Sequence, residues 1–382
     1  MRLLRSGLSR DVAKPRMKEL VEHLFRAIPS GIGSHRKDLR LDAAEIRKVM
    51  DRGASWAVAR GFGSQADLDG IESMGRIGSA VPELVSARAV ERGRNQLGTL
   101  GSGNHFVEIG YVAEIFDETA ARVLGLEKDS VTAIIHTGSR GLGYQVCDDS
   151  IAEMIRAAAK YGIDLPDRQL CCAPLPSEEG KRYLGAMGAA ANFAFANRQV
   201  ITGLLRQVFE EVLSRSPRDL GLSIVYDVCH NIAKWESHEV DGRARRLCVH
   251  RKGATRAFPP GHAEIPPAYR GIGQPVLIPG DMGRYSYVLT GTHRAYGETF
   301  GSTCHGAGRR LSRAAARREG KHRPLVRELE DRGIFVRSEG RMTLVEEMPE
   351  AYKDVARVVD VCQKAGISRK VARLVPTGVI KG

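Results

Sequence analysis

The stretch VTAIIHTGSRGLG, residues 131–143, runs from five apolar or β-branched residues into a loop of polar residues and glycine. A run of this length is typical of a buried strand, and loops held by strands commonly carry functional residues. Three further stretches share this pattern: LSIVYDVCHN at 222–231, RLCVHRKGATRAFPPG at 246–261 and PVLIPGDMGRYSYVLTGT at 275–292. The pattern predicts buried strands that end in functional loops.

Helical patterns lie between these strands. Leu20, Leu24 and Ile28 recur at helical spacing before Pro29, which predicts a helix that ends there. Further helices are expected over 43–59 and 176–214, and residues 1–10 read as a short strand. No repeat or linker divides the chain. We therefore expect one α+β domain over residues 1–382, with mixed sheets flanked by helices.

The composition indicates a globular protein with an anionic partner. The chain has 382 residues, of which 42% are hydrophobic, and a formal net charge of +13, so it can bury a core and attract polyanions. Seven cysteines without a CxxC pair argue against zinc fingers and a disulfide framework. The sequence shows no membrane-spanning run and no leader, which predicts a cytoplasmic protein without a membrane partner.

Three histidines stand where predicted strands meet loops. His136 follows the run 131–135, His230 follows the run 224–229, and His105 lies in LGSGNHFVEIG at 100–110. Any one of them could be an ordinary core histidine, but three in such loops favour a metal site. Imidazole suits manganese, zinc, iron or copper, so the histidines alone do not choose the metal.

The other histidines carry weaker signals. His250 is a further candidate because Arg251, Lys252 and Arg256 surround it. Six histidines in polar contexts are expected at the surface: His23, His35, His238, His262, His293 and His322.

The stretch STCHGAGRR at 302–310 places His305 beside Gly306 and Gly308, which allow a bound group to approach the backbone closely. The alternative is a tight turn that happens to carry a histidine. Arg309 and Arg313 are the cations that we expect on phosphate, whereas the later arginines of this segment could form a solvated helix face. Arg140, in the glycine loop after His136, is a further phosphate candidate.

Taken together, these motifs resemble the RtcB family of GTP-dependent RNA-splicing ligases. The motifs LGSGNHFVEIG, HTGSRGLG, VYDVCHN, VHRKGATRAFPPGH, STCHGAGR and EAYKDV and the closing Lys381 and Gly382 occur in the family's order. The resemblance implies an RtcB-like fold and an RNA ligase in which His305 attacks GTP to give a histidine–GMP intermediate. Guanylate would then pass to an RNA 3′-phosphate, and a 5′-hydroxyl would displace GMP, in tRNA splicing or RNA repair. A 2′,3′-cyclic phosphate end would first be hydrolysed.

The resemblance also assigns the site. It implies two manganese ions, with His105, His136 and His230 as ligands, and an RNA substrate; an archease-type activating protein is a further partner by likeness. Tyr352 and Lys381 match positions that contact guanine. The residues expected around the nucleotide are Asn104, Glu108, Asp281, Gly306, Ala307, Gly308, Tyr352 and Lys381.

Two features depart from the family pattern. PGDMG replaces the usual PGSMG, so Asp281 would stand near the phosphates and, if ionised, would need an arginine or metal partner. An Asp-x-Gly-Cys-Gly-Met motif, whose aspartate and cysteine bind metal in the family, would precede the segment that begins at Met1. We therefore expect a chain that lacks an N-terminal portion and binds metal more weakly.

Two other functions remain open on the residues alone. A metal-dependent phosphoesterase could use His105, His136 and His230 to activate water, and a catalytically impaired fragment could retain only RNA binding and weak metal binding. His305 separates the ligase from the phosphoesterase, because a hydrolase needs no histidine nucleophile beside a phosphate loop.

Overall fold

A computed structural model describes residues 1–382 and is built around one eight-stranded sheet. Seven strands follow the order β4-β1-β3-β2-β12-β9-β8, and β11 pairs with β12 in parallel. The strands of this sheet are β1 (Arg2–Ser9), β2 (Phe106–Ile115), β3 (Ser130–His136), β4 (Ser223–Asp227), β8 (Pro275–Ile278), β9 (Ser286–Thr290), β11 (Phe335–Ser338) and β12 (Arg369–Lys381). Two small sheets pair β5 (Asn231–Val240) with β6 (Arg243–Lys252), and β7 (Ala254–Arg256) with β10 (Ser302–Cys304).

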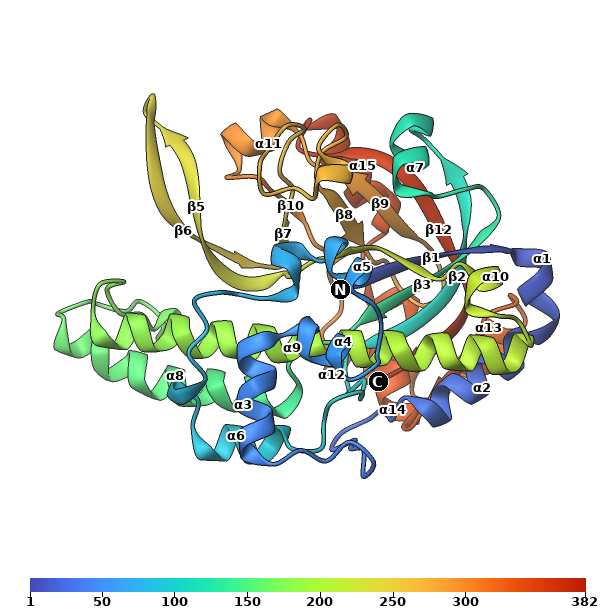
Figure 1. The fold of residues 1–382 in the computed structure, drawn as a ribbon, viewed down its shortest axis with the longest axis horizontal. Helices are drawn as coiled ribbons and strands as arrows, with labels where there is room; N and C mark the ends of the chain where they lie inside the picture. Colours follow the sequence, from blue (N-terminus) through green and yellow to red (C-terminus); the bar gives the residue numbers. More distant parts are fainter.

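Helices cover both sides of the sheet (Figure 1). The longest, α9 (Glu178–Leu213), runs below it, beside α2 (Met17–Ala27), α3 (Ala43–Arg52), α4 (Ala54–Ala59), α6 (Ala87–Gly93) and α8 (Arg140–Lys160). The other helices are α1 (Arg10–Ala13), α5 (Gln65–Asp69), α7 (Glu118–Leu124), α10 (Pro217–Leu220), α11 (His293–Glu298), α12 (Arg313–Gly320), α13 (Leu325–Glu330), α14 (Arg341–Glu346) and α15 (Val355–Lys364). No helix combines the length and apolar character needed to cross a membrane.

The main core lies between α9 and the sheet. A cluster of 41 buried residues joins α9 and α2 to strands β1, β2 and β3, and a second cluster of 20 fills the opposite side of these strands. The α+β prediction is therefore confirmed.

Several predicted elements are also confirmed, and one predicted helix is divided into two. β1 begins the chain as expected, α2 ends before Pro29, and α9 occupies 178–213. The helix expected over 43–59 is divided at Gly53, whose φ is 59°. A Cβ at Gly53 would stand 2.1 Å from the carbonyl oxygen of Gly75, so the chain approaches another segment too closely there for any other residue.

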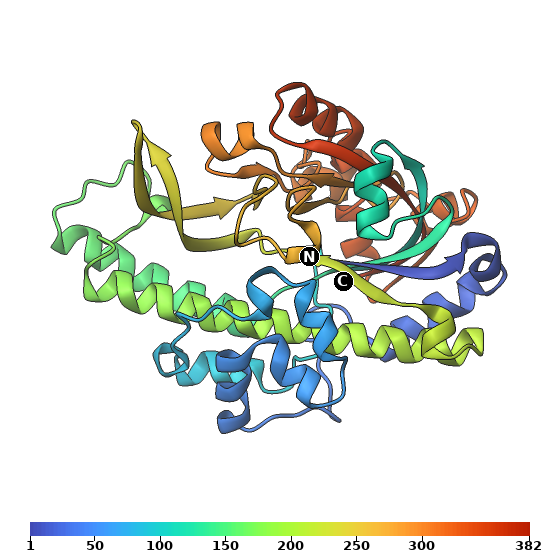
Figure 2. The same ribbon diagram turned by 45° about the horizontal axis from the view of Figure 1, so that its top comes forward.

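The apolar run that opens the stretch 246–261 is not a buried strand, which corrects the sequence interpretation. β6 pairs only with β5, and Arg243–Arg246 are exposed, so the two strands project as a hairpin (Figures 1 and 2). Three arginines in four residues cannot be buried without partners, which keeps this strand outside the core. His238, expected at the surface, is instead buried and lies 3.0 Å from Glu236.

The register of the sheet brings the functional loops together. Phe106 pairs with His136 on one side and with Lys381 on the other, so the start of β2 and the ends of β3 and β12 lie at one edge. On β1, Arg2 pairs with Asp227, the last residue of β4, which brings His230 to the same edge.

Candidate active site

Four histidines gather at this edge of the sheet. The ring centroids of His230 and His305 stack 3.6 Å apart, and His136 lies 5.2 Å from His230 and 5.5 Å from His305. The side chains of His136, His230 and His305 each offer a nitrogen within 4.8 Å of the others, which is close enough to share a metal ion. His105 lies 6.0 Å from His136 and outside this group. The closest group thus contains His305 in place of the predicted His105.

The electrostatics of the cluster suit a metal ion. Burial lowers the pKa of His105 and of His305 to about 3, and that of His136 and His230 well below the usual value. The imidazoles are therefore neutral at pH 7, and each keeps a lone pair for coordination or nucleophilic attack. The Nδ1 atoms of all four are buried without a hydrogen-bond partner. Unsatisfied buried nitrogens in one cluster fit a divalent metal site.

A buried ion network supports the cluster from behind. Asp227 accepts hydrogen bonds from Arg2 at 2.8 Å and from Arg198 at 2.9 Å, and both guanidiniums are buried. Arg198 also donates to the carbonyl oxygen of Thr137, next to His136. Because the network joins β1, β4 and α9, it fixes the strand ends that carry the histidines. Sequence analysis missed it, since Arg2 and Asp227 are 225 residues apart and leave no local pattern.

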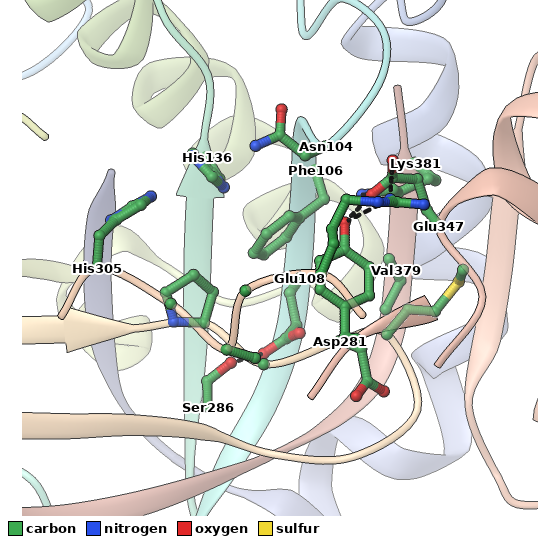
Figure 3. A pocket seen from close by; sticks show the side chains of 18 of the residues that line it. Asn104, Phe106, Glu108, His136, Asp281, Ser286, His305, Glu347, Val379 and Lys381 are labelled. Atoms are coloured by element: carbon green, nitrogen blue, oxygen red, sulfur yellow. Dashed lines mark hydrogen bonds and ion pairs between the residues drawn. The ribbon is translucent and has the colours of Figure 1, made fainter. Parts of the chain in front are cut away.

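A pocket of ≈ 240 Å³ lies beside His305 (Figure 3). Figure 3 shows His305 and His136 on one side of it and Glu347 and Lys381 on the other. All the residues that were expected around the nucleotide line this one pocket: Asn104, Glu108, Asp281, Gly306, Ala307, Gly308, Tyr352 and Lys381. Arg309 and Arg313 also line it.

Two carboxyl groups shape the floor of the pocket. Glu108 is buried, and burial together with Asp281 raises the pKa of its carboxyl to about 8. Asp281 accepts a hydrogen bond from Arg284 Nε at 2.6 Å and another from the Gly283 amide at 3.0 Å. Burial still raises the pKa of Asp281, and its effect exceeds that of Arg284. The arginine partner that Asp281 was expected to need is therefore present.

Glu347 organises the opposite wall. This buried carboxylate accepts hydrogen bonds from the Tyr352 hydroxyl and, at 3.1 Å, from Arg309 Nη1, and Lys381 Nζ lies 3.5 Å away. The Arg309 guanidinium stands 5.1 Å from the Tyr352 ring centroid. Arg309 is thus already paired in the pocket wall. Sequence analysis missed Glu347, whose only signal was its place five residues before Tyr352.

The glycines after His305 allow two loops to touch. The Ala307 amide donates to the Pro279 carbonyl oxygen at 3.2 Å, and a Cβ on Gly306 would stand 3.3 Å from the same oxygen. Gly308 has a φ of 74°, a conformation that glycine adopts readily.

The predicted phosphate residues have different environments. Arg313 is largely exposed at the pocket edge, with its Nε 3.4 Å from Glu346. Arg140 lines no part of the pocket, because its Nε donates to Thr99 at 3.1 Å and its guanidinium lies against Gly101. Burial lowers the pKa of Arg140 to about 10. Arg140 thus packs behind the histidines.

A second groove, of ≈ 580 Å³, opens from the other side of the histidines. Its walls come from α8 and α9, which supply Cys147, Tyr183 and Met187, and from the β5–β6 hairpin. Asn104 and His136 line both cavities. The histidine cluster therefore stands where the pocket and the groove meet.

Comparisons with known proteins agree with this arrangement of motifs. The family model described as tRNA-splicing ligase RtcB matches residues 1–382. A tRNA-splicing ligase RtcB of Archaeoglobus fulgidus is 54% identical over 382 residues, which cover 100% of this chain and 79% of that protein. One from Methanococcus maripaludis is 52% identical with the same coverage. One from Pyrococcus abyssi is 54% identical, and there the matched region covers 42% of the relative.

Proposed function

The chain belongs to the RtcB family of tRNA-splicing ligases, and we propose that it joins RNA ends through a guanylylated His305. The observation that carries the proposal is the position of His305, whose imidazole is neutral, lines the pocket and stacks on His230 of the histidine cluster. A neutral imidazole is a competent nucleophile, and a second imidazole stacked on it restricts its orientation.

The first step is attack by a nitrogen of His305 on the α-phosphorus of GTP. A nitrogen–phosphorus bond forms, the bond to the bridging oxygen breaks, and pyrophosphate leaves. Glu108, as a carboxylate, would accept hydrogen bonds from the N–H groups of guanine, and Tyr352 and Lys381 would border the base. The paired side chains of the pocket wall hold these groups before the nucleotide binds.

The second and third steps use RNA. An oxygen of the RNA 3′-phosphate attacks the histidine-bound phosphorus, which releases neutral His305 and leaves GMP on the RNA end. The 5′-hydroxyl then attacks the RNA phosphorus, loses its proton, and expels GMP as the new phosphodiester forms. The open groove, which reaches the histidines from the side opposite the nucleotide pocket, suits the RNA ends.

Manganese fits the cluster, and His105, His136 and His230, with their buried unpartnered nitrogens, would hold it. When bound there, a divalent ion would neutralise phosphate charge. An archease-type partner and a cytoplasmic location stay predictions.

The decisive test is covalent labelling with GTP that carries a labelled α-phosphate, in the presence of manganese. We expect an adduct that is labile in acid and stable in alkali, as a phosphoramidate is, and that is absent from His305→Ala.

Cys304→Ala is the matched control and should keep the label. Contact with Cys362 and burial raise the pKa of the Cys304 thiol, so it is protonated and a poor nucleophile. A label that persists in His305→Ala would refute the assignment. Hydrolysis of RNA ends with no adduct in the wild-type protein would favour the phosphoesterase.

A further inference from the structure

One face of the β5–β6 hairpin continues the open groove away from the histidines. Successive residues of a strand point to opposite faces, so alternate positions share one face. The cross-strand pairs on this face are Asn231 with Lys252, Ala233 with His250, Trp235 with Cys248, and Ser237 with Arg246. The first two pairs line the groove, and the next two extend the same face outward. Lys252 and Arg246 are six residues apart, about 20 Å along a strand.

This face combines an exposed aromatic ring with cations. The Trp235 side chain is 43% exposed, and the Arg246 guanidinium stands 5.3 Å from its ring centroid. His250 and Lys252 are exposed as well. The ion pairs of the hairpin, Lys234 with Glu72 and Arg251 with Glu236, belong to the opposite face. The cations of the Trp235 face are therefore free to neutralise an anion.

Helix α9 stands across the groove from this face. Cys147 of α8 and Tyr183 of α9 line the same groove as Asn231 and Lys252 of the hairpin. The groove between them leads to His136 and His230. A chain lying on the Trp235 face would therefore reach the histidine cluster at its inner end.

We propose that this face binds the single-stranded RNA that leads to the joining site, with phosphates on Arg246 and Lys252 and a base stacked on Trp235. The choice of RNA over other polyanions rests on the proposed function. Single strands are favoured over duplexes because an aromatic side chain can stack only on a base that is not stacked in a helix. Free cations along the path supply the contacts to the backbone.

Tryptophan emission gives a direct test, because the chain has two tryptophans and the other, Trp56, is buried. The full chain would be titrated without GTP, using a ten-nucleotide RNA that ends in a 3′-phosphate. We expect the RNA to quench the emission of Trp235, and Trp235→Phe to bind with similar affinity while showing no quenching. Saturation of binding without any change in Trp235 emission would overturn the proposal.

Binding measured by fluorescence anisotropy separates a defined path from general charge. Trp235→Ala and Arg246→Ala should each weaken binding about tenfold, in line with the loss of one stacked base or its supporting cation. Arg245→Ala is the matched control, since Arg245 is exposed on the same strand but belongs to the opposite face, and it should cost about twofold or less. Equal losses for Arg245→Ala and Arg246→Ala would refute the path, as would equal quenching by a blunt duplex.

The labelling of His305 by GTP, done without RNA on the same protein, keeps the two proposals apart. If His305 is labelled but RNA binding does not change the emission of Trp235, the ligase proposal stands and the hairpin proposal is refuted. If RNA quenches the emission of Trp235 but His305 is not labelled, the hairpin proposal stands and the ligase proposal is refuted.

Discussion

Two arginine–aromatic pairs of nearly equal geometry stand at the two ends of the site. In the nucleotide pocket, Arg309 lies 5.1 Å from the ring of Tyr352, and on the hairpin Arg246 lies 5.3 Å from the ring of Trp235. The pocket pair is tied to the buried carboxylate of Glu347, whereas the hairpin pair is exposed and belongs to no ion pair. One contact type thus serves in two environments.

The difference teaches how each region would recognise its ligand. In the pocket, charges are paired and desolvated before the nucleotide arrives, so the geometry is fixed and a lost partner leaves an uncompensated charge. On the hairpin, solvent screens the charges, so each charge contributes little to RNA affinity and the total affinity depends on salt. Substitutions should therefore have large and specific effects in the pocket, and small and additive effects outside it.

The largest effect is expected for Glu347→Gln. This change leaves Arg309 and Lys381 without their carboxylate in a buried site and should lower the free energy of unfolding by ~3–5 kcal/mol. It should also raise the KM for GTP in the labelling of His305, because the glutamine side chain keeps only one of the two oxygens that accept from Tyr352 and Arg309. Denaturant unfolding and labelling kinetics measure the two effects.

Glu350→Gln is the control for that comparison. Glu350 lies three residues further on and pairs with Arg323 at 2.8 Å, but its side chain is 51% exposed. Exposed pairs contribute about 0–1 kcal/mol. If Glu350→Gln destabilised the protein as much as Glu347→Gln, the contrast between paired, buried charge and exposed charge would be wrong.

The pH dependence of the pocket should be the next largest effect. The folded-state pKa of Glu108 is about 8, above its ordinary value of 4.5, so the folded protein holds a proton that the unfolded chain releases. Stability should therefore fall as the pH rises from about 4.5 to about 8, and Glu108→Gln should remove this part of the fall. The KM of the wild-type protein for GTP should decrease as the pH rises through 8, because only the ionised carboxylate of Glu108 can accept two hydrogen bonds from guanine. An unchanged pH profile in Glu108→Gln would count against both statements.

Metal binding tests the histidine cluster itself. His136→Ala should weaken manganese binding, measured by calorimetry, about tenfold or more, since His136 is one of the three proposed ligands and its ring lies 6.0 Å from that of His105 and 5.2 Å from that of His230. His293→Ala, an exposed histidine at the start of α11, should leave it unchanged. Equal affinity in the wild-type protein and His136→Ala would exclude the cluster as the metal site.

Sequence reasoning predicted many of the residues that line the nucleotide pocket but not the buried ion pairs around Glu347 and Asp227. The residues expected around the nucleotide came from a resemblance of motifs, and each motif is a loop whose neighbours in sequence are also neighbours in space. Glu347 and Asp227 were missed because their charged partners come from other segments, Arg309 and Lys381 for Glu347 and Arg2 and Arg198 for Asp227. Pairing at a distance depends on the register of strands, which local patterns do not reveal.

The interpretation of 246–252 failed for a related reason. Leu247, Cys248 and Val249 read as a buried strand, but a strand is buried only if other elements cover both its faces. The arginines at 243, 245 and 246 were the signal that this strand lies outside the sheet. Arg140 lies outside the nucleotide pocket, because its side chain contacts Thr99 and Gly101.

The smallest effects are expected in the arginine-rich helix α12. Two of its arginines are exposed, like those of the hairpin, but paired with a carboxylate, like Arg309 in the pocket. Arg313 and Arg317 are both more than half exposed, and both pair with Glu346. A pair with a carboxylate must be broken or shared before the arginine can neutralise a phosphate, so each contributes less to RNA affinity than the free Arg246. Arg313→Ala and Arg317→Ala should each lower affinity about two- to threefold for all RNA sequences alike. Each should also reduce the slope of log affinity against log salt concentration by about one. Anisotropy titrations at several salt concentrations measure both quantities. A loss at Arg313 or Arg317 larger than at Arg246, or a dissociation constant that does not vary with salt, would place the main RNA contact on α12 and not on the hairpin.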